Sequence, residues 1–462
     1  MVNKIHSASF RDPSGFILYH NHVLYRQINY DYKENYDHLM QSGLYTQLSQ
    51  ENLLIPHQEV SLNISSLPSH YKIIQPEKIP FVSYPYEWCF SQLKDAALLT
   101  LKVQKIALEF GMILKDSSVY NIQFKDCHPI LIDTLSFEKY KNNQLWPGYK
   151  QFIQHFLAPL ALIKYAGPEC TSFFKSFIDG VPLAFASKLL PFSSYFNFSL
   201  LTHIHLHAKT QNIFFQKEIN SSGQKISKKS LCALIDNLEN TVKNLYWKPQ
   251  ATYWDNYYNE QNSYTPEALK NKQQLVNNFL AQTNPENIWD LGANTGIFSQ
   301  IAQEKGIFTL SLDKNESCIE KNYHQCQNAN LKNILPLVVD IANPSPSLGW
   351  ANQERDSLVK RGPADMVFVL GLMHHLRITD NICFENLAKF FSQICKWLII
   401  EFIPKNDSQV EKMLKDRKDI FDDYYQSQFE NVFQRYFELQ KCKDITQSLR
   451  KIYLFKQKES CE

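Results

Sequence analysis

The amino-acid sequence predicts an α/β fold with a parallel sheet in its second half, preceded by an α+β domain. Five short runs rich in apolar residues alternate there with helical patterns: 287–292, 308–313, 334–340, 365–371 and 397–403. Such alternation is typical of βαβ units and a parallel sheet. Two further runs, 435–441 and 450–457, are separated only by a short polar segment and predict a closing antiparallel hairpin.

The length of the chain predicts two domains. A single hydrophobic core seldom grows beyond roughly 250–300 residues, and this chain has 462. The stretch 246–262 is rich in polar and aromatic residues and separates two blocks with different patterns. We therefore expect one domain over residues 1–248 and a second over residues 249–462.

The first domain combines strand and helix patterns. It opens with a hairpin at 15–28, whose turn holds His20, Asn21 and His22. The elements expected after it are a helical stretch near 33–50, a strand at 79–88, an amphipathic helix at 91–111 and two short strands at 117–124 and 128–133.

Composition and charge exclude several classes of protein. The net charge is +2 and the pI about 7.9, so we expect no nucleic-acid partner. No apolar run reaches the roughly 18 residues of a membrane-spanning helix, and the cysteines form no C-x-x-C pair. His203, His205 and His207 alternate on what should be a surface strand or helix start, without a neighbouring cysteine or carboxylate. We expect a cytoplasmic protein without a metal site or a membrane span, and the sequence does not indicate its oligomeric state.

A glycine turn stands out in the second domain. Two of the chain's 13 glycines, Gly292 and Gly296, fall in the stretch WDLGANTG at 289–296, between a predicted strand and a predicted helix. Glycine at such a turn permits positive φ and lets the main chain approach a ligand closely. A dinucleotide dehydrogenase would prefer the pattern G-x-G-x-x-G, which this turn lacks.

Acidic residues end the first three predicted strands of the second domain. They are Asp290, Asp313 and Asp340, and the carboxyl ends of parallel strands meet at one edge of a sheet. Asp313 follows the glycine turn by about twenty residues, where a carboxylate can accept hydrogen bonds from both hydroxyls of a ribose. Asp340 can meet an adenine amino group. The sequence therefore predicts a nucleoside site at this edge.

The chain resembles the class I S-adenosylmethionine-dependent methyltransferases over roughly residues 262–458. The resemblance is carried by the glycine turn, the acidic strand ends, the fourth predicted strand DMVFVLGLMHHL and the terminal hairpin. The resemblance implies a Rossmann-like, seven-stranded sheet that binds S-adenosyl-L-methionine across its strand ends. It implies that Asp290 and the backbone around Gly292, Asn294 and Gly296 hold the methionine part, that Asp313 takes the ribose and Asp340 the adenine, and that Leu370 and Gly371 line the cofactor floor.

Methyl transfer from a sulfonium needs a base only where the acceptor keeps its proton until attack. His374 and His375 follow the fourth strand and are the candidates for that base. Since adjacent side chains usually point apart, we expect at most one of them to be catalytic, and both could simply shape the loop. Glu401 is a further catalytic candidate; alternatively it lies at the lip of the site and pairs with Lys405.

The whole chain also resembles the NoeA-like nodulation methyltransferases and their bacterial relatives. The stretches that carry this resemblance are YKENYDHLMQSGLY (32–45), YPYEWCFSQLKDAAL (84–98), IDTLSFEKY (132–140) and EFIPKNDSQVEKML (401–414). The resemblance implies a glycan, a lipid-linked molecule or another small molecule as the acceptor.

A second candidate site lies in the first domain. Asp116 and Asn121 are five residues apart, and Asp133 follows after an apolar strand. This spacing resembles the catalytic loop of protein-kinase-like and aminoglycoside-phosphotransferase-like domains. The resemblance implies that Asp116 orients the nucleophile, while Asn121 and Asp133 hold the magnesium of Mg-ATP.

The first domain lacks other parts of a phosphotransferase. It has no glycine-rich phosphate loop and no V-A-I-K lysine, and Arg26 is the nearest basic residue on a strand. Two alternatives stay open beside a plain methyltransferase. The protein is bifunctional, transferring both phosphoryl and methyl groups, or an inactive kinase-like domain recruits a partner to the methyltransferase.

Overall fold

The computed structural model describes residues 4–62, 70–209, 226–249, 264–415 and 418–459. The chain divides into two compact units: unit 1 is Met1–Lys248 with Ser347–Arg355, and unit 2 is Pro249–Pro346 with Asp356–Glu462. A short segment of the second half of the sequence thus packs with unit 1. Most of the predicted junction at 246–262 lies outside the described residues.

Unit 1 begins with an antiparallel five-stranded sheet of order β1-β2-β3-β5-β4. Its strands are β1 (Lys4–Ile5), β2 (Gly15–His20), β3 (Val23–Asn29), β4 (His57–Glu59) and β5 (His70–Pro76). The predicted hairpin at 15–28 is confirmed, and Asn21 and His22 take the positive φ that a two-residue hairpin turn requires. The helical stretch near 33–50 forms two helices, α1 (Lys33–Gln41) and α2 (Leu44–Gln50), which separate at Gly43 with φ +89°.

The predicted strand at 79–88 is wrong. Residues 77–84 form no regular element, and only a 3-10 turn, η2 (Pro85–Glu87), follows. Two prolines remove backbone donors that a strand would use. The apolar side chains are nevertheless buried, as Trp88 shows with 0% exposure. The side chain of Gln123 replaces a strand partner, because its Oε1 accepts the backbone N–H of Ser83 at 2.8 Å.

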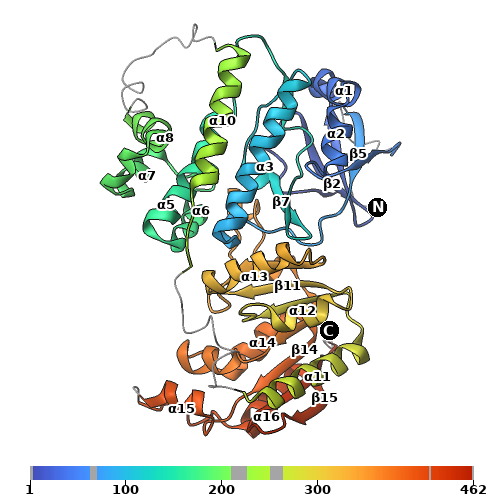
Figure 1. The fold of residues 1–462 in the computed structure, drawn as a ribbon. Helices are drawn as coiled ribbons and strands as arrows, with labels where there is room; N and C mark the ends of the chain where they lie inside the picture. The colour runs from blue at the N-terminus through green and yellow to red at the C-terminus, as the bar shows by residue number, and fades with distance from the viewer. Residues whose placement is uncertain (1–3, 63–69, 210–225, 250–263, 416–417, 460–462) are drawn as a thin grey trace. The chain divides into compact units, whose positions relative to one another are not determined.

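A helical part completes unit 1. The predicted helix at 91–111 is α3 (Phe90–Glu109), which lies beside α10 (Lys228–Asn244), joined by a Lys105–Asp236 ion pair of 2.5 Å (Figure 1). Two small two-stranded sheets follow α3: β7 and β8 form a hairpin, and β6 pairs with β9, which come before and after that hairpin in the chain. The strands of these sheets are β6 (Met112–Leu114), β7 (Ile122–Lys125), β8 (His128–Leu131) and β9 (Phe137–Lys139). Besides short 3-10 turns, the helical elements that follow are α4 (Tyr149–Phe152), η4 (Ile153–Leu157), α5 (Ala158–Ala166), α6 (Phe173–Ser176), α7 (Leu183–Leu189), α8 (Phe198–Leu200) and η7 (Leu201–Leu206).

The alternating histidines lie near the start of a helical segment, which was one of the two expected forms, but the expectation that this segment lies at the surface is wrong. His203 and His205 lie in the helical turn η7 and are 4% and 0% exposed. His205 contacts the hydroxyls of Ser187 and Ser194, each at 2.8 Å. Its ring also stacks on Tyr195 with centroids 3.7 Å apart. These histidines are therefore hydrogen-bonded core residues.

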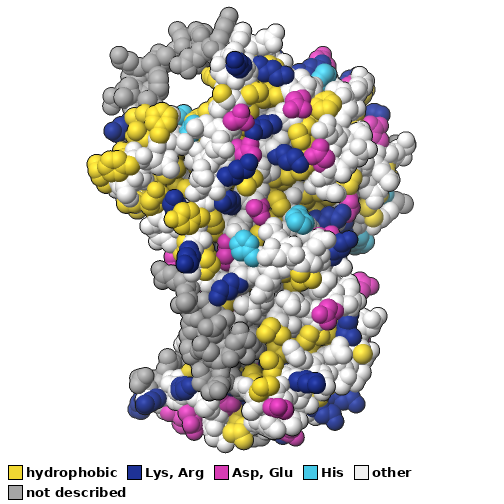
Figure 2. Space-filling view, in the orientation of Figure 1, with side chains coloured by type: hydrophobic (Ala, Val, Ile, Leu, Met, Phe, Trp, Pro, Cys, Tyr) yellow, Lys and Arg dark blue, Asp and Glu magenta, His cyan; other side chains and the backbone are white. Residues whose placement is uncertain are grey.

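Apolar side chains gather on the surface of unit 1 near α7 and α8 (Figure 2). Phe192, Phe196 and Phe198 are 75%, 81% and 77% exposed. The rings of Phe192 and Phe196 touch edge to face, with centroids 5.6 Å apart. Neighbouring phenylalanines this exposed are typical of a contact surface.

Unit 2 contains a seven-stranded sheet of order β12-β11-β10-β13-β14-β16-β15. Its first five strands in sequence are parallel, and β16 pairs antiparallel with both β14 and β15. The strands are β10 (Asn287–Leu291), β11 (Phe308–Asp313), β12 (Ile334–Val338), β13 (Ala364–Val369), β14 (Cys395–Phe402), β15 (Phe437–Asp444) and β16 (Lys451–Gln457). The predicted α/β class and the closing hairpin are confirmed.

Helices cover both faces of this sheet, as the alternation along β16 illustrates. Ile452 and Leu454 belong to a core cluster with α11 and α12, whereas Tyr453 and Phe455 meet Phe429 of α16 on the other face. The helices are α11 (Pro266–Thr283), α12 (Ile297–Gln303), α13 (Glu316–Asn328), α14 (Phe384–Ile394), α15 (Ser408–Lys415) and α16 (Gln426–Tyr436). The strand order reverses between β10 and β13, and open α/β sheets bind ligands at such a point.

No helix in the described ranges combines the length and the apolar character needed to cross a lipid bilayer.

Candidate functional site

The glycine turn after β10 has the left-handed backbone that its sequence predicts. Gly292, Asn294 and Gly296 have φ of +72°, +54° and +85°. A Cβ on Gly296 would lie 2.6 Å from the side-chain nitrogen of Asn322, and one on Gly292 would lie 3.1 Å from Leu372. Both positions therefore require glycine for conformational and steric reasons, while asparagine tolerates the left-handed region at 294.

The Asp313 carboxylate lies at the carboxyl end of β11 and is held by two backbone donors. The N–H of Asn294 donates to its Oδ2 and the N–H of Asn315 to its Oδ1, each at 2.8 Å. The first bond joins Asp313 directly to the glycine turn. Hydrogen bonds to a charged acceptor are stronger than neutral ones, so the carboxylate is fixed in one orientation and its other lone pairs stay available to a ligand.

Asp290 lies beneath the same turn. Its side chain is 2% exposed, and its Oδ2 accepts a hydrogen bond of 2.7 Å from the Ser299 hydroxyl on α12. Burial raises the pKa of this carboxyl to about 7, against the lowering effect of Ser299 and of nearby Lys272. Asp290 can therefore exchange a proton near neutral pH, which an exposed aspartate does not.

Three further predicted residues lie at neighbouring strand ends. Asp340 follows β12 and is exposed, and its Oδ1 accepts the N–H of Ala342 at 2.9 Å. The N–H of the preceding Val339 donates to the Asp313 carbonyl at 2.9 Å, which ties the ends of β11 and β12 together. Leu370 packs its side chain into the core, so it can offer only its backbone to a ligand, and Gly371 has φ +79°.

The structure brings His374 and His375 together after β13. Their ring centroids are 4.1 Å apart, so the expectation that the two side chains point apart is wrong. His374 is 1% exposed, and burial, the neighbouring His375, Arg450 and Lys272 hold its pKa well below the usual range. Burial and the nearby Lys314 lower the pKa of His375 to about 4. Both rings are thus neutral at pH 7 and able to accept a proton.

Glu401 lies inside unit 2 and not at its lip. Its side chain is 0% exposed and pairs with Lys272 at 2.8 Å, and it accepts a hydrogen bond from the Tyr264 hydroxyl. Lys405 pairs instead with Asp419 at 2.8 Å. The alternative that Glu401 lies at the lip of the site and pairs with Lys405 is therefore wrong.

A second buried ion pair extends this network. Arg450, just before β16, contacts Asp407 at 2.7 Å and lies 3.9 Å from Glu401. Lys272 on α11 is 1% exposed, and burial lowers its pKa. The sequence did not lead us to Lys272, Arg450 or Asp407. Because the carboxylate of Glu401 is surrounded by cations and a hydroxyl, it is better placed to hold charged neighbours than to remove a proton.

In unit 1 the predicted residues Asp116, Asn121 and Asp133 come together in the segments that join the two small sheets. The Asn121 amide donates to the Ser136 hydroxyl at 3.1 Å, and that hydroxyl donates to Asp133 Oδ2 at 2.7 Å. Burial and the charge of Asp133 raise the pKa of Asp116. The three side chains thus form one polar cluster, although they are spread over a loop and the turn after β8.

Arg26 on β3 occupies the other oxygen of Asp133. The distance from its Nη1 to Asp133 Oδ1 is 2.5 Å, and both side chains are only 12% exposed. Both oxygens of Asp133 therefore have partners within the protein. Among the described residues, no group of three His, Cys, Asp or Glu side chains is arranged to hold a metal ion. A magnesium ion at Asn121 and Asp133 would have to displace Arg26 from Asp133.

Several solved methyltransferase structures show weak likeness to the chain. N-methyltransferase NodS from Bradyrhizobium japonicum WM9, in complex with S-adenosyl-L-homocysteine, is 11% identical over 44% of this chain and 93% of its own, with a TM-score of 0.33. The bifunctional kinase-methyltransferase WbdD is 15% identical over 41% of this chain and 39% of its own, with a TM-score of 0.29. At these TM-scores the likenesses assign neither a fold nor a role to this chain.

Similarity to one curated protein extends over almost the full length. No protein-family model matches the chain. The nodulation protein NoeA of Rhizobium meliloti (strain 1021) is 33% identical over 461 residues, which cover 98% of this chain and 96% of that protein. Identity at this level across both units shows common descent of the whole chain, and the protein belongs to the family of the nodulation protein NoeA.

Proposed function

We propose that unit 2 is a class I methyltransferase that uses S-adenosyl-L-methionine. The observation that carries this proposal is the Asp313 carboxylate, held by two backbone N–H groups beside a left-handed glycine turn where the strand order reverses. A pre-oriented carboxylate at the end of the second strand suits the two hydroxyls of a ribose.

The other strand-end residues suit the rest of such a cofactor. The exposed carboxylate of Asp340 can accept a hydrogen bond from an adenine amino group, and Asp290 with the main chain of the turn can hold a methionine ammonium. When bound, the cofactor supplies a methyl group activated on a sulfonium. The task of the protein is then to orient the acceptor in line with that methyl group and to exclude water.

We propose a glycan, a lipid-linked molecule or another small molecule as the acceptor. This proposal is tested by incubating the protein with labelled S-adenosyl-L-methionine and measuring the labelled methyl groups in glycan, lipid and small-molecule fractions. The Asp313→Ala variant is the negative control. Label in one fraction that depends on Asp313 would support methyl transfer and name the acceptor class. Equal labelling by both proteins would refute the assignment.

Either histidine after β13 can accept the acceptor's proton, and the pH dependence of the rate distinguishes this role. Because the pKa of His375 is about 4, the neutral base persists above that pH, and its loss should appear only as the pH falls through about 4. We expect kcat to show no histidine-dependent limb between pH 5.5 and 8, and His375→Ala to lower kcat while leaving cofactor affinity unchanged. Asp290, with a pKa of about 7, can produce a limb of its own in this range. A limb near pH 6.5, the ordinary value for histidine, that disappears in His375→Ala would contradict this prediction.

We propose that unit 1 has a kinase-like fold that binds the acceptor or a partner. The convergence of Asp116, Asn121 and Asp133 in the segments that join two small sheets supports the kinase-like fold. The Arg26–Asp133 ion pair favours binding over phosphoryl transfer, because a magnesium ion would have to displace the arginine.

A thermal-shift titration separates this proposal from the bifunctional alternative. We expect magnesium-ATP to leave the unfolding temperature unchanged, while S-adenosyl-L-homocysteine raises it. A ligand at about 100 times its dissociation constant adds about 2.7 kcal/mol to the stability of the state that binds it. A magnesium-dependent shift that disappears in Asp133→Asn would contradict the binding role and favour a bifunctional enzyme.

A further inference from the structure

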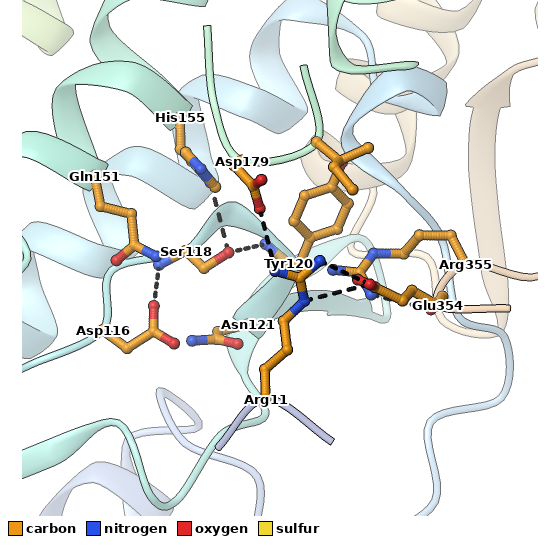
Figure 3. Close-up of a pocket in the computed structure, with 11 residues that line it drawn as sticks. Arg11, Asp116, Ser118, Tyr120, Asn121, Gln151, His155, Asp179, Glu354 and Arg355 are labelled. Carbon is orange, nitrogen blue, oxygen red and sulfur yellow. Dashed lines mark hydrogen bonds and ion pairs between the residues drawn. The ribbon is translucent and has the colours of Figure 1, made fainter. Parts of the chain in front are cut away.

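Unit 1 contains a polar pocket of about 220 Å³. Its lining comes from five parts of unit 1 (Figure 3). They are Arg11, the loop that holds Asp116 and Asn121, the helical segment with Gln151 and His155, the turn at Ile178 and Asp179, and the end of the segment Ser347–Arg355. Pockets for drug-sized ligands measure about 300–1,000 Å³. This pocket therefore has room for a ligand of about the size of one sugar.

The segment Ser347–Arg355 lies between β12 and β13 in sequence but packs with unit 1. It is anchored near its end, where Arg11 pairs with Glu354 at 2.8 Å and the Ser7 hydroxyl donates to the Gln353 carbonyl at 2.7 Å. Glu354 is 6% exposed. Residues 1–248 alone would thus lack one wall of the pocket, and the anchored segment supplies it together with Arg355.

Arg355 is a cation without an acidic partner. Its guanidinium lies over the Tyr120 ring, 4.0 Å from the centroid, and its Nη1 donates to the Glu354 carbonyl at 3.0 Å. No described carboxylate lies within ion-pair distance of it. Its Nε and the Tyr120 hydroxyl are buried atoms that form no hydrogen bond with any described residue. A buried donor without an acceptor costs free energy. A ligand atom that accepted a hydrogen bond from either group would remove that cost.

The nearby carboxylates of the pocket pair with Arg11 and not with Arg355. Arg11 already pairs with Glu354, and the Asp179 carboxylate, 84% exposed, lies 4.0 Å from Arg11. His155 is buried, and burial lowers its pKa to about 4, so it is neutral at pH 7. Arg11 therefore takes both nearby carboxylates as its ion-pair partners, which leaves Arg355 as a cation without an ion pair in a pocket end that has no net charge.

We infer that this pocket binds a small hydroxylated ligand whose oxyanion, a carboxylate or a phosphate, contacts Arg355 and the Tyr120 hydroxyl. Arginine binds both anions with paired N–H donors, and bonds of this kind are among the strongest in proteins. At the other end of the pocket, Asp116, Asn121 and Gln151 offer polar atoms that suit sugar hydroxyls. The inference does not depend on methyl transfer by unit 2.

Calorimetric titration of the full chain at 0.15 M salt with glucose 6-phosphate, glucuronate and glucose tests this inference. We expect at least one of the two anionic probes to bind, and glucose to bind at least about tenfold more weakly or not at all. Arg355→Met keeps an apolar side chain over Tyr120 but removes the charge, and it should weaken the anionic probe at least about tenfold. Tyr120→Phe should weaken it by a smaller factor.

Arg435→Met is the matched control, because Arg435 is 63% exposed, pairs with Glu385 and belongs to unit 2. It should leave binding of the anionic probe unchanged. Preference for the phosphate or for the carboxylate identifies the source of the oxyanion. The inference is overturned if neither anionic probe binds, if glucose binds as tightly, or if Arg355→Met binds the anionic probe as well as the unaltered protein.

Discussion

Asp313→Ala should weaken S-adenosyl-L-homocysteine binding by about 100-fold or more in a calorimetric titration. The carboxylate is oriented by the N–H groups of Asn294 and Asn315, and alanine removes both acceptor oxygens offered to the ribose. A hydrogen bond to a charged group contributes about 1.5–3 kcal/mol, and each 1.4 kcal/mol is about tenfold in affinity. Two such bonds give the expected loss.

Asp365→Ala is the matched control. Asp365 also accepts a backbone N–H, from Glu286 at 3.0 Å, but it lies at the start of β13, at the opposite end of that strand. This variant should bind the ligand normally. Asp340→Ala, at an exposed position, should fold and lose about tenfold in affinity through one lost hydrogen bond. Full affinity in both Asp313→Ala and Asp340→Ala would show that the ligand does not bind at these strand ends.

Lys272→Met should lower the free energy of unfolding by about 3–5 kcal/mol in denaturant titrations. Removing one partner of a buried ion pair leaves the other charge uncompensated, and losses of this size are typical. Here the remaining charge would be Glu401, which is 0% exposed. The Lys272→Met, Glu401→Gln double variant should recover part of the loss, because no charge is then left without its partner.

Lys396→Met is the control for this prediction. Lys396 lies on the same strand as Glu401 and pairs with Asp365 at 2.6 Å, but its side chain is 63% exposed. An exposed ion pair contributes about 0–1 kcal/mol, so the change should stay below about 1 kcal/mol. Equal losses for the two lysines would mean that burial does not determine the effect.

Local sequence patterns were sufficient to predict much of unit 2. The five parallel strands of its sheet are each marked by an apolar run, whereas β15 is mostly polar and exposed. The turn after β10 needs glycine, and the two glycines are visible in the sequence. The ends of neighbouring parallel strands lie at one edge of a sheet, and Asp313 at the end of β11 accepts the N–H of Asn294 in the turn after β10. In these cases the contact follows from the fold class alone.

Contacts between distant segments could not be predicted in this way. Arg355 lines the unit 1 pocket although its segment lies between two strands of unit 2 in the sequence. No local sequence pattern indicates that this segment packs with unit 1. Lys272 did leave a signal, because it lies on the buried side of α11, four residues from both Ala268 and Val276. A lysine in an apolar helical stripe indicates a buried partner, which here is Glu401.

Hydrogen exchange of the full chain with and without S-adenosyl-L-homocysteine tests the proposed cofactor site without any substitution. Protection should increase in the peptides that cover the glycine turn at 290–296, the end of β11 at 313–315 and residues 340–342. The N–H groups of Asn294 and Asn315 there donate to Asp313. Protection confined to unit 1, or no change in these three peptides at saturating ligand, would contradict the assignment of unit 2 as the methyltransferase.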